Sequence, residues 1–254
     1  MGILVGGRAT IKKQLEDIER IIPGRVSEHL YMQHIARYEF ARSFVRDMVV
    51  ADVACGTGYG SYDLLKSGGA KRIVGVDISE EAIRYAGEHY KADGLEFVQG
   101  DATSLNLGEE QFDVVVSFET IEHIGLCDRY LDELFRVLTP SGTAIISTPN
   151  SRFSQYNPYH INEFSPREFH SLLSQRFLVC RLIGQCHLTF ARRTRVRLNK
   201  SLPRLMGLLG VVPKWLKHAI IGVRRENPRY VDADFKVGNE DMRNCVYLIA
   251  VCKK

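Results

Sequence analysis

Short β-prone apolar runs alternate with helical patterns along the middle of this chain, and this alternation constrains the fold more than any other feature. The β-prone runs lie at 49–54, 73–76, 95–98, 112–118 and 143–148, and helical patterns lie between them at 61–66, 80–91 and 127–138. Continuous apolar runs such as Val114–Val116 suit strands that are covered on both faces, as in a parallel sheet. We therefore predict an α/β protein with a doubly wound, Rossmann-like sheet.

The rest of the chain completes this organisation. We predict an N-terminal helical cap at 1–48 and a core at 49–188. A basic amphipathic insert follows at 189–244, and 245–254 is the final strand of the core. Ser165 is placed to cap a short helix that starts at Pro166. The last two strands, 177–188 and 245–252, form a hairpin at the sheet edge in the most economical arrangement. The prediction is a seven-stranded, mostly parallel sheet whose last strand is antiparallel.

Composition excludes several other classes of protein. The 254 residues are 45% hydrophobic and 25% charged, which is typical of a globular chain. No uninterrupted apolar window is long enough for a transmembrane helix, and the start MGILVGGRAT lacks the pattern of a signal peptide. The six cysteines form no C-x-x-C pair. We expect a reduced, cytoplasmic setting.

The basic residues are concentrated in the insert. Between Phe190 and Tyr230 eleven Lys/Arg face one acid, Glu226, so this segment carries +10 while the remainder carries −6. Amphipathic helices at 202–209 and 214–223 would suit peripheral contact with the inner membrane face. The same charges also fit a helical lid with a solvated basic face, or a phosphate-bearing substrate such as RNA. Nucleic acid is less favoured, because no aromatic residues are interleaved with the basic run.

A glycine-rich turn follows the first β-prone run, in the sequence DVACGTGYG that starts at Asp52. Glycine lets the backbone approach a ligand closely. The dinucleotide fingerprint needs a third glycine where Ser61 stands, so NAD binding is disfavoured. The next two runs are followed by Asp77, which can accept both ribose hydroxyls, and by Asp101, beside a position suited to adenine. Three acids repel phosphates but suit a cationic nucleoside.

These ordered motifs, with QFDVVVSFETIEH and TAIISTPN after them, resemble the class I S-adenosylmethionine-dependent methyltransferases over roughly 37–177. The resemblance implies that Asp52 and the turn hold the methionine end of the cofactor, Asp77 the ribose, and Asp101 with Ala102 the adenine. The family commonly has glycine where this chain has Ala54. The implied cofactor-binding set in this part of the chain is Asp52, Ala54, Cys55, Gly56, Gly58, Asp77, Ile78, Asp101, Ala102 and Phe118.

Two further stretches, ERIIPGRVSEHLYMQHIARYEFA and NPYHINEFSPREF, resemble methyltransferases associated with polysaccharide and glycolipid biosynthesis. In such enzymes the leading helix closes over the cofactor. The resemblance therefore implies that His34, Arg37 and Tyr38 contact the carboxylate or sulfonium side of S-adenosylmethionine. Phe40 is expected only to pack the helix onto the sheet.

A cluster of acids and histidines follows the fourth β-prone run. If Glu119-x-x-Glu122-His123 is helical, its three polar side chains share one face. Together with His160 from a later loop, they suit a divalent ion such as Mg²⁺, Mn²⁺ or Zn²⁺. The pattern resembles small-RNA 2′-O-methyltransferases and ubiquinone-pathway O-methyltransferases, in which a metal presents an acceptor oxygen to the methyl group.

Other interpretations of this cluster stay open. A metal-free site would use His123 or His160 as the general base beside Glu119, and a purely structural role would place the acids at a helix dipole. For the whole chain we expect an O-methyltransferase acting on a hydroxyl of a sugar, a glycan or a lipid-linked small molecule. One alternative is an RNA-modifying methyltransferase that uses the segment 190–230. The other is a non-catalytic module that binds a membrane or a partner protein.

Overall fold

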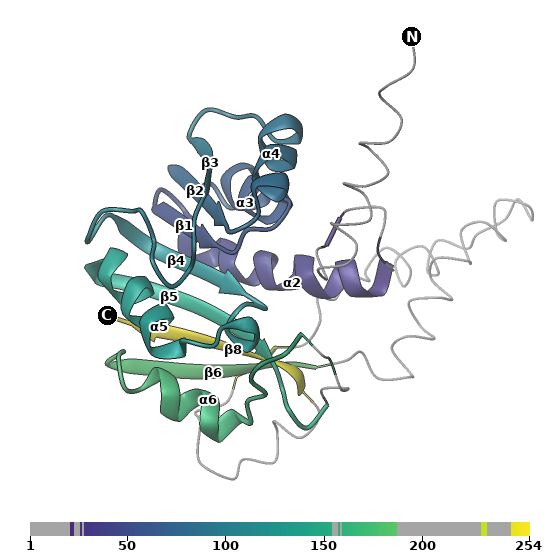
Figure 1. Ribbon diagram of the computed structural model, residues 1–254, viewed down its shortest axis with the longest axis vertical. Helices are drawn as coiled ribbons and strands as arrows, with labels where there is room; N and C mark the ends of the chain where they lie inside the picture. The colour runs from purple at the N-terminus through teal and green to yellow at the C-terminus, as the bar shows by residue number, and fades with distance from the viewer. Residues whose placement is uncertain are drawn as a thin grey trace, which may run out of the picture.

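The computed structural model describes residues 21–22, 26, 28–153, 157, 159–186, 230–232 and 245–254 (Figure 1). The helical elements are α2 (Glu28–Val45), α3 (Tyr59–Lys66), α4 (Glu80–His89), the single 3₁₀ turn η1 (Ile121–His123), α5 (Cys127–Val137) and α6 (Pro166–Leu173). The strands are β1 (Val49–Val53), β2 (Arg72–Asp77), β3 (Leu95–Gln99), β4 (Phe112–Phe118), β5 (Leu138–Pro149), β6 (Val179–Cys186), β7 (Tyr230–Asp232) and β8 (Cys245–Lys253).

The strands form one sheet in the order β3-β2-β1-β4-β5-β8-β6-β7. The first five strands are mutually parallel, and β8 is antiparallel to both β5 and β6. The predicted doubly wound, mostly parallel α/β fold with an antiparallel last strand is therefore confirmed. The predicted antiparallel pairing of the last two strands is confirmed, because β8 pairs with β6 beside β5. The described sheet has one strand more than the predicted seven, which moves the pair one strand in from the edge. The edge strand is instead β7, which comes from the predicted insert and pairs with β6.

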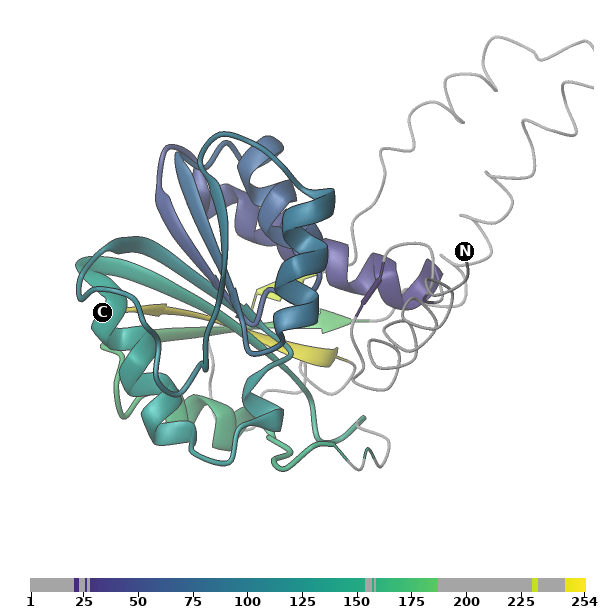
Figure 2. The same ribbon diagram turned by 45° about the horizontal axis from the view of Figure 1, so that its top comes forward.

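Helices cover both faces of this sheet, as Figure 2 shows. Successive side chains of a strand point to opposite faces, so each buried strand contributes to two cores. In β1, Val50 belongs to the core that contains buried residues of α2 and α3, whereas Ala51 and Val53 belong to the core that contains those of α5 and α6. This two-sided burial explains why the strand sequences are almost continuously apolar.

Two helix starts have the local chemistry that the sequence suggests. Ser79 precedes α4 and accepts a hydrogen bond from the Ala82 amide at 3.3 Å. Ser165 accepts from the Glu168 amide, and the Glu168 carboxylate accepts from the Ser165 amide, which completes a capping box at the start of α6. The prediction for Ser165 is confirmed.

Several sequence predictions fall outside the described residues. They are the part of the predicted N-terminal helical cap before residue 28, apart from residues 21, 22 and 26, and the amphipathic helices at 202–209 and 214–223. Nearly all of the basic segment 190–230 also lies there. Within the described part of the chain, no helix has the length and apolarity needed to cross a bilayer.

The contact between α2 and α3 depends on Gly60. A β-carbon at this position would lie 2.0 Å from the nearest atom of the Tyr38 ring. Tyr38 is buried, its hydroxyl lies 3.3 Å from an Asp52 oxygen, and its ring packs against Tyr59 and Phe118. The ring is therefore held from several sides and cannot move aside easily.

Gly60→Ala should therefore destabilise the fold by about 1–3 kcal/mol through overpacking. Gly87→Ala is the matched control, because Gly87 is exposed in α4 and an added β-carbon there meets nothing within 4 Å. The control should be neutral or more stable by roughly 0.5–1 kcal/mol. Urea unfolding of the two variants measures the difference, and equal stability would contradict the role assigned to Gly60.

Candidate functional site

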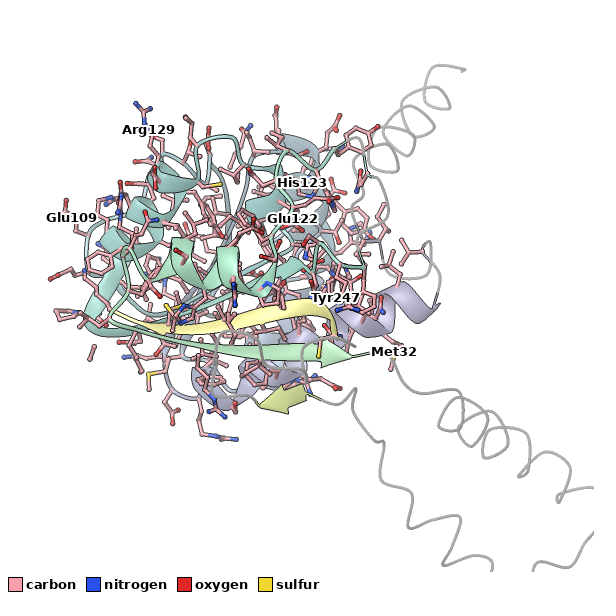
Figure 3. All side chains as sticks on the ribbon, turned by 90° about the horizontal axis from the view of Figure 1, so that it is seen from below. Met32, Glu109, Glu122, His123, Arg129 and Tyr247 are labelled. Carbon is pink, nitrogen blue, oxygen red and sulfur yellow. The ribbon has the colours of Figure 1, made fainter. Side chains whose placement is uncertain are left out.

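A cavity of about 760 Å³ opens at the carboxyl ends of the parallel strands. The strand order reverses between β1 and β4, and ligands of open α/β sheets bind at such a switch point. Figure 3 shows Glu122, His123 and Tyr247 near this end of the molecule, whereas Glu109 and Arg129 lie near the other end.

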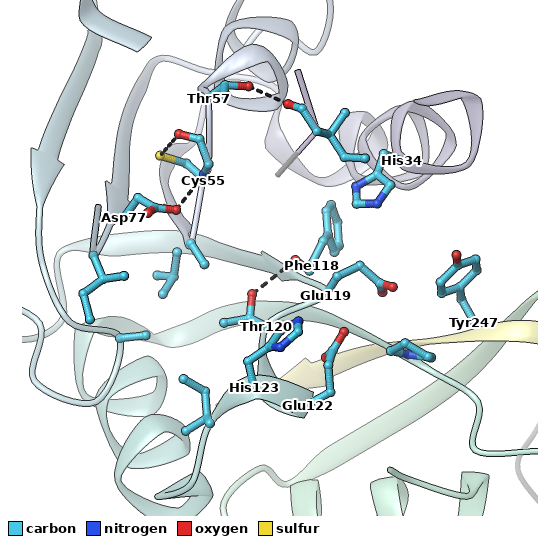
Figure 4. Close-up of a pocket in the computed structure, with 18 of the residues that line it drawn as sticks. His34, Cys55, Thr57, Asp77, Phe118, Glu119, Thr120, Glu122, His123 and Tyr247 are labelled. Atoms are coloured by element: carbon cyan, nitrogen blue, oxygen red, sulfur yellow. Dashed lines mark hydrogen bonds between the residues drawn. The ribbon is translucent and has the colours of Figure 1, made fainter. Parts of the chain in front are cut away.

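The cavity lining falls into two parts, which Figure 4 shows together. The β1–β3 half is lined by Val53–Thr57, Val76–Ile78 and Gly100–Ala102. The β4–β8 half is lined by Phe118–Thr120, Glu122–Ile124, Pro149, Phe153, Asn157, His160 and Val246–Tyr247. Tyr59 and residues of α2, including His34 and Tyr38, also line the cavity.

Asp77 is held in place by two backbone amides in the β1–β3 half. Its Oδ2 accepts from the Gly56 amide at 2.9 Å, and its Oδ1 accepts from the Ser79 amide at 2.9 Å. A carboxylate has about four acceptor sites, so each oxygen can accept another hydrogen bond. The arrangement suits the vicinal hydroxyls of a ribose, as the sequence predicts.

Asp101, which the sequence assigns to the adenine end of the cofactor, also lines the cavity. The Asp101 Oδ1 accepts from both the amide and the hydroxyl of Thr103, at 2.7 and 2.8 Å, which fixes the carboxylate. Ile78 and Ala102 line the same half. Ile78 is 64% exposed although it is apolar, so a flat aromatic ligand that covers it would bury apolar surface.

The glycine turn serves two different purposes. Ala54, Gly56 and Gly58 all have positive φ, at 62°, 56° and 81°. Gly56 lines the cavity, and an added β-carbon would meet nothing within 4 Å, so the backbone angle is what favours glycine there. Gly58 does not line the cavity. A β-carbon at Gly58 would lie 2.7 Å from Ala86 and from the Phe97 ring, so glycine is also required there for packing.

Asp52 also lies behind the cavity wall. Its Oδ2 accepts from the Ser61 hydroxyl at 2.6 Å and from the Tyr38 hydroxyl at 3.3 Å. Complete burial raises the pKa of Asp52 to about 7. Asp52 does not line the cavity itself, but it is hydrogen-bonded to Tyr38, which does. Its predicted contact with the methionine end stays a prediction.

Aromatic rings from three elements meet beside the turn. The Tyr38 ring lies 5.6 Å from Tyr59 and 5.0 Å from Phe118, and all three line the cavity. Burial raises the pKa of both tyrosines well above the usual value, so their phenols stay neutral. A wall of neutral aromatic rings attracts a cationic group such as a sulfonium.

Arg37 is fully buried and does not line the cavity, and its predicted contact with the cofactor stays a prediction. Its Nη1 donates to the Gln185 Oε1 at 2.9 Å, and its guanidinium lies 4.4 Å from the centre of the Tyr247 ring. Its Nη2 is 3.9 Å from the Glu119 Oε2. Arg37 therefore supports two cavity side chains from behind. His34, by contrast, does line the cavity, and burial followed by the charge of Arg37 lowers its pKa well below the usual value.

Glu119 lines the cavity but does not belong to a helix. Its φ is +53°, and the following η1 is a single 3₁₀ turn, so the helical spacing considered for Glu119, Glu122 and His123 is not realised. The Ser147 hydroxyl donates to the Glu119 Oε1 at 2.7 Å. Glu119 is not among the side chains whose ligand atoms meet in the cavity.

Glu122, His123 and His160 do come together. Each offers one ligand atom, and these three atoms lie within 4.8 Å of one another. The Glu122 Oε2 accepts from the Thr148 hydroxyl at 3.2 Å, while its buried Oε1 has no hydrogen-bond partner among the described residues. Burial and the nearby Glu119 raise the pKa of Glu122 well above the usual value.

The orientation of His123 is set by a backbone carbonyl. Its Nδ1 lies 3.0 Å from the Tyr159 oxygen, which can only accept, so Nδ1 carries the proton. The Nε2 lone pair is then available to bind a metal or to accept a proton. The His160 ring lies 5.0 Å away at a steep angle.

Other cavity residues carry no signal in the sequence. Tyr247 lies on β8 and enters the site only because this strand inserts between β5 and β6. Thr57 lies in the turn, and its hydroxyl donates to the Ile21 carbonyl at 2.8 Å, which ties the N-terminal segment to the cavity (Figure 4). A composition or motif argument cannot find such contacts, because they depend on tertiary structure.

Comparison with known proteins agrees with this geometry. Residues 45–179 match a family described as a methyltransferase domain. The chain belongs to this methyltransferase family. Its fold resembles a crystal structure of an S-adenosylmethionine-dependent methyltransferase from Thermotoga maritima, with a TM-score of 0.60 and 15% identity over 88% of this chain and 91% of that one.

Two relatives in mycobacteria are similar in sequence. A probable S-adenosylmethionine-dependent methyltransferase of Mycolicibacterium smegmatis is 32% identical over 162 residues, which are 61% of this chain and 62% of that protein. A fatty-acid O-methyltransferase of the same organism is 31% identical over 140 residues, which are 54% of this chain and 51% of that protein. The chain thus matches between half and two thirds of the length of these curated relatives.

The position of Asp77 leads to a test of cofactor binding by this chain. In Asp77→Asn the amide nitrogen would face a backbone N–H and could not accept from both ribose hydroxyls. We expect S-adenosylmethionine affinity to fall roughly 10- to 100-fold, since hydrogen bonds to charged groups are worth about 1.5–3 kcal/mol. Asp93→Asn, at an exposed site outside the cavity lining, is the control. Calorimetric titration that finds equal affinity for both variants would refute the ribose assignment.

Proposed function

We propose that this protein transfers a methyl group from S-adenosylmethionine to a hydroxyl oxygen of an acceptor that carries an apolar chain. The observation that carries the proposal is the presence of two kinds of chemistry in one cavity. The β1–β3 half has groups that suit a cationic nucleoside, and the β4–β8 half has the Glu122, His123 and His160 cluster.

The residues of the β1–β3 half fit S-adenosylmethionine, which supplies a methyl group on a positively charged sulfur. Asp77 would hold the ribose, Ile78 and Ala102 the adenine, and the turn at Gly56 the methionine end. Tyr38, Tyr59 and Phe118 would contact the sulfonium side. Alignment of donor and acceptor is worth at most about 7–11 kcal/mol of the barrier.

A hydroxyl acceptor needs help to lose its proton at neutral pH. The Glu122, His123 and His160 cluster can provide this help, and we propose that it does so by holding a divalent cation. Three observations support the cation. The unpartnered Glu122 Oε1 is buried, the Nε2 of His123 is available, and His160 lies within reach of both. Bound to an acceptor oxygen, a cation lowers the cost of removing the proton.

The cation is tested by binding, independently of turnover. Metal-free protein titrated with Mn²⁺ should show one site by calorimetry and by electron paramagnetic resonance. Glu122→Gln or His160→Ala should weaken Mn²⁺ binding by about 10-fold or more. Glu119→Gln is the matched control and should change the affinity only a few-fold, because Glu119 lies outside the cluster. If neither Mn²⁺ nor Zn²⁺ binds, the cation is refuted and His123 is left as the general base.

The acceptor class is inferred from the apolar surface around the cavity. The described residues include eight exposed large apolar side chains. Six of them either line the cavity or lie within two positions, along the sequence, of a residue that lines it. They are Met32, Ile78, Leu126, Phe153, Tyr159 and Ile161. Clustered exposed apolar side chains mark ligand sites more often than bare surface. The adenine would cover Ile78, and a lipid-linked acceptor would cover the other five. The similarity to a fatty-acid O-methyltransferase supports the same class of acceptor.

Acceptor choice is tested with hydroxyl-bearing glycolipids and their deacylated head groups. With labelled S-adenosylmethionine, kcat/KM should be at least about 10-fold higher for the acylated compounds, and the label should be on oxygen. Phe153→Ala should lower kcat/KM for the acylated acceptor roughly 5- to 20-fold. Leu178→Ala is the control, since Leu178 is exposed but does not line the cavity. Equal use of deacylated head groups, or label on nitrogen or carbon, would contradict the proposal.

The described residues supply no observation that favours RNA or a non-catalytic role. The predicted basic partner surface at 190–230 lies almost entirely outside them. Membrane contact through that segment, a cytoplasmic location and RNA binding stay predictions from the sequence.

A further inference from the structure

Four of the six cysteines in the chain lie on two strands that pair with each other. β6 carries Cys180 and Cys186, and β8 carries Cys245 and Cys252. The antiparallel register places Cys180 opposite Cys252 and Cys186 opposite Cys245. A cross-strand pair of cysteines therefore lies near each end of the same ladder. The sequence has no C-x-x-C motif that would predict these pairs, because only the register of the two strands brings the cysteines opposite each other.

The pair at Cys180 and Cys252 has the geometry of a bond that can form. The two sulfurs lie 2.9 Å apart. Residues directly opposite on antiparallel strands have α-carbons about 4.5–5.5 Å apart, within the range of about 4.4–6.8 Å that a disulfide spans. The two strands therefore do not have to move for the sulfurs to join.

We propose that Cys180 and Cys252 are an oxidation site at which a low-molecular-weight disulfide, such as oxidised glutathione, produces a cross-strand disulfide. Both cysteines are free thiols in this structure. The bond would link β6 to β8 across the segment 181–251, which contains the basic insert.

The two thiols differ in a way that assigns their roles. Cys180 is half-buried and reachable, whereas Cys252 is fully buried. The hydrogen bond from the Cys252 thiol lowers the pKa of Cys180, and that contact together with burial raises the pKa of Cys252. Cys180 is therefore the nucleophile toward the external disulfide, and Cys252 is the residue that resolves the intermediate.

The exchange balances in two steps. The Cys180 thiolate attacks one sulfur of the small disulfide, and the other half leaves as a thiolate that takes up a proton. Cys252 then loses its proton and attacks the Cys180 sulfur, which releases the second small thiol. Two protein thiols are oxidised to one disulfide, and one small disulfide is reduced to two thiols.

The site is separate from the proposed methyl-transfer site. Cys252 pairs with Ala144 on its other side, whereas the cavity residue Tyr247 pairs with Pro149 at the opposite end of β5. Neither Cys180 nor Cys252 lines the cavity. Oxidation should therefore leave S-adenosylmethionine affinity unchanged, and the fate of this proposal does not depend on that of the methyl-transfer reaction.

The primary test uses the full-length wild-type chain and needs no variant. Protein is incubated with oxidised glutathione, alkylated, digested without reductant and mapped by mass spectrometry. The expected product is one intramolecular cross-link between the peptides that contain Cys180 and Cys252. Unchanged thiols, stable glutathionylation of Cys180, a cross-link between other cysteines, or a disulfide-linked dimer would each overturn the proposal.

A stability measurement gives a second, independent readout. The cross-link closes a long loop, so the oxidised wild type should melt about 5 °C or more above the reduced protein. Cys180→Ser should lose this shift. Cys127→Ser, at another half-buried thiol outside the ladder, should keep it. Because each variant is compared with its own reduced form, a general loss of stability in either variant is not mistaken for loss of the cross-link.

Discussion

The buried carboxyl of Asp52 is the interaction on which the site depends most. It lies inside β1 and accepts hydrogen bonds from Tyr38 on α2 and from Ser61 on α3. A buried carboxyl is costly unless it is hydrogen-bonded, so these two contacts fix both helices against the end of the strand. Gly60 makes the arrangement possible by leaving room for the Tyr38 ring. The position of Tyr38 in the aromatic wall of the cavity therefore follows from the hydrogen bonds that the buried Asp52 carboxyl accepts.

A similar principle governs the opposite half of the cavity. Arg37 is a buried cation, and its partners are an amide oxygen of Gln185, the face of Tyr247 and, more distantly, Glu119. Glu119 has a backbone angle that a side-chain-bearing residue rarely adopts, and Ser147 and Arg37 hold its two carboxylate oxygens from different sides. Such strain persists only where the surroundings over-determine it. The carboxylates of the site are thus positioned by polar groups that never reach the cavity themselves.

The sequence predicts the sheet well, because hydrophobic periodicity records how strands are buried. β4 is found at its predicted bounds, and the other core strands differ by a few residues at their ends. The sequence also identifies Asp77, Asp101, Glu122, His123 and His160 as cavity residues. Asp77 ends a strand and Asp101, Glu122 and His123 lie in the short connections after strands, so their position along the chain places them at the carboxyl edge of the sheet. His160 lies in the longer loop after β5.

Four residues show what the position of a motif along the chain leaves undetermined. Asp52, Gly58 and Arg37 are predicted to contact the cofactor, and in the structure each also contacts neighbours from another element. A motif specifies which residue follows a strand. It does not specify which side chains from other elements contact that residue in the folded chain. Tyr247 was missed for the same reason, since its strand enters the sheet out of sequence order.

The inserted strand β8 shows how strongly contacts between distant parts of the chain determine the structure. One antiparallel strand brings Tyr247 to the cavity at one end of the sheet and Cys252 against Cys180 at the other. Both pairings join residues that are far apart in sequence, so neither produces a local motif. Because the ladder register fixes both at once, a shift of β8 by one residue would move both side chains to the opposite face. The position of Tyr247 beside Arg37 and the contact between the two thiols are therefore two consequences of the same register.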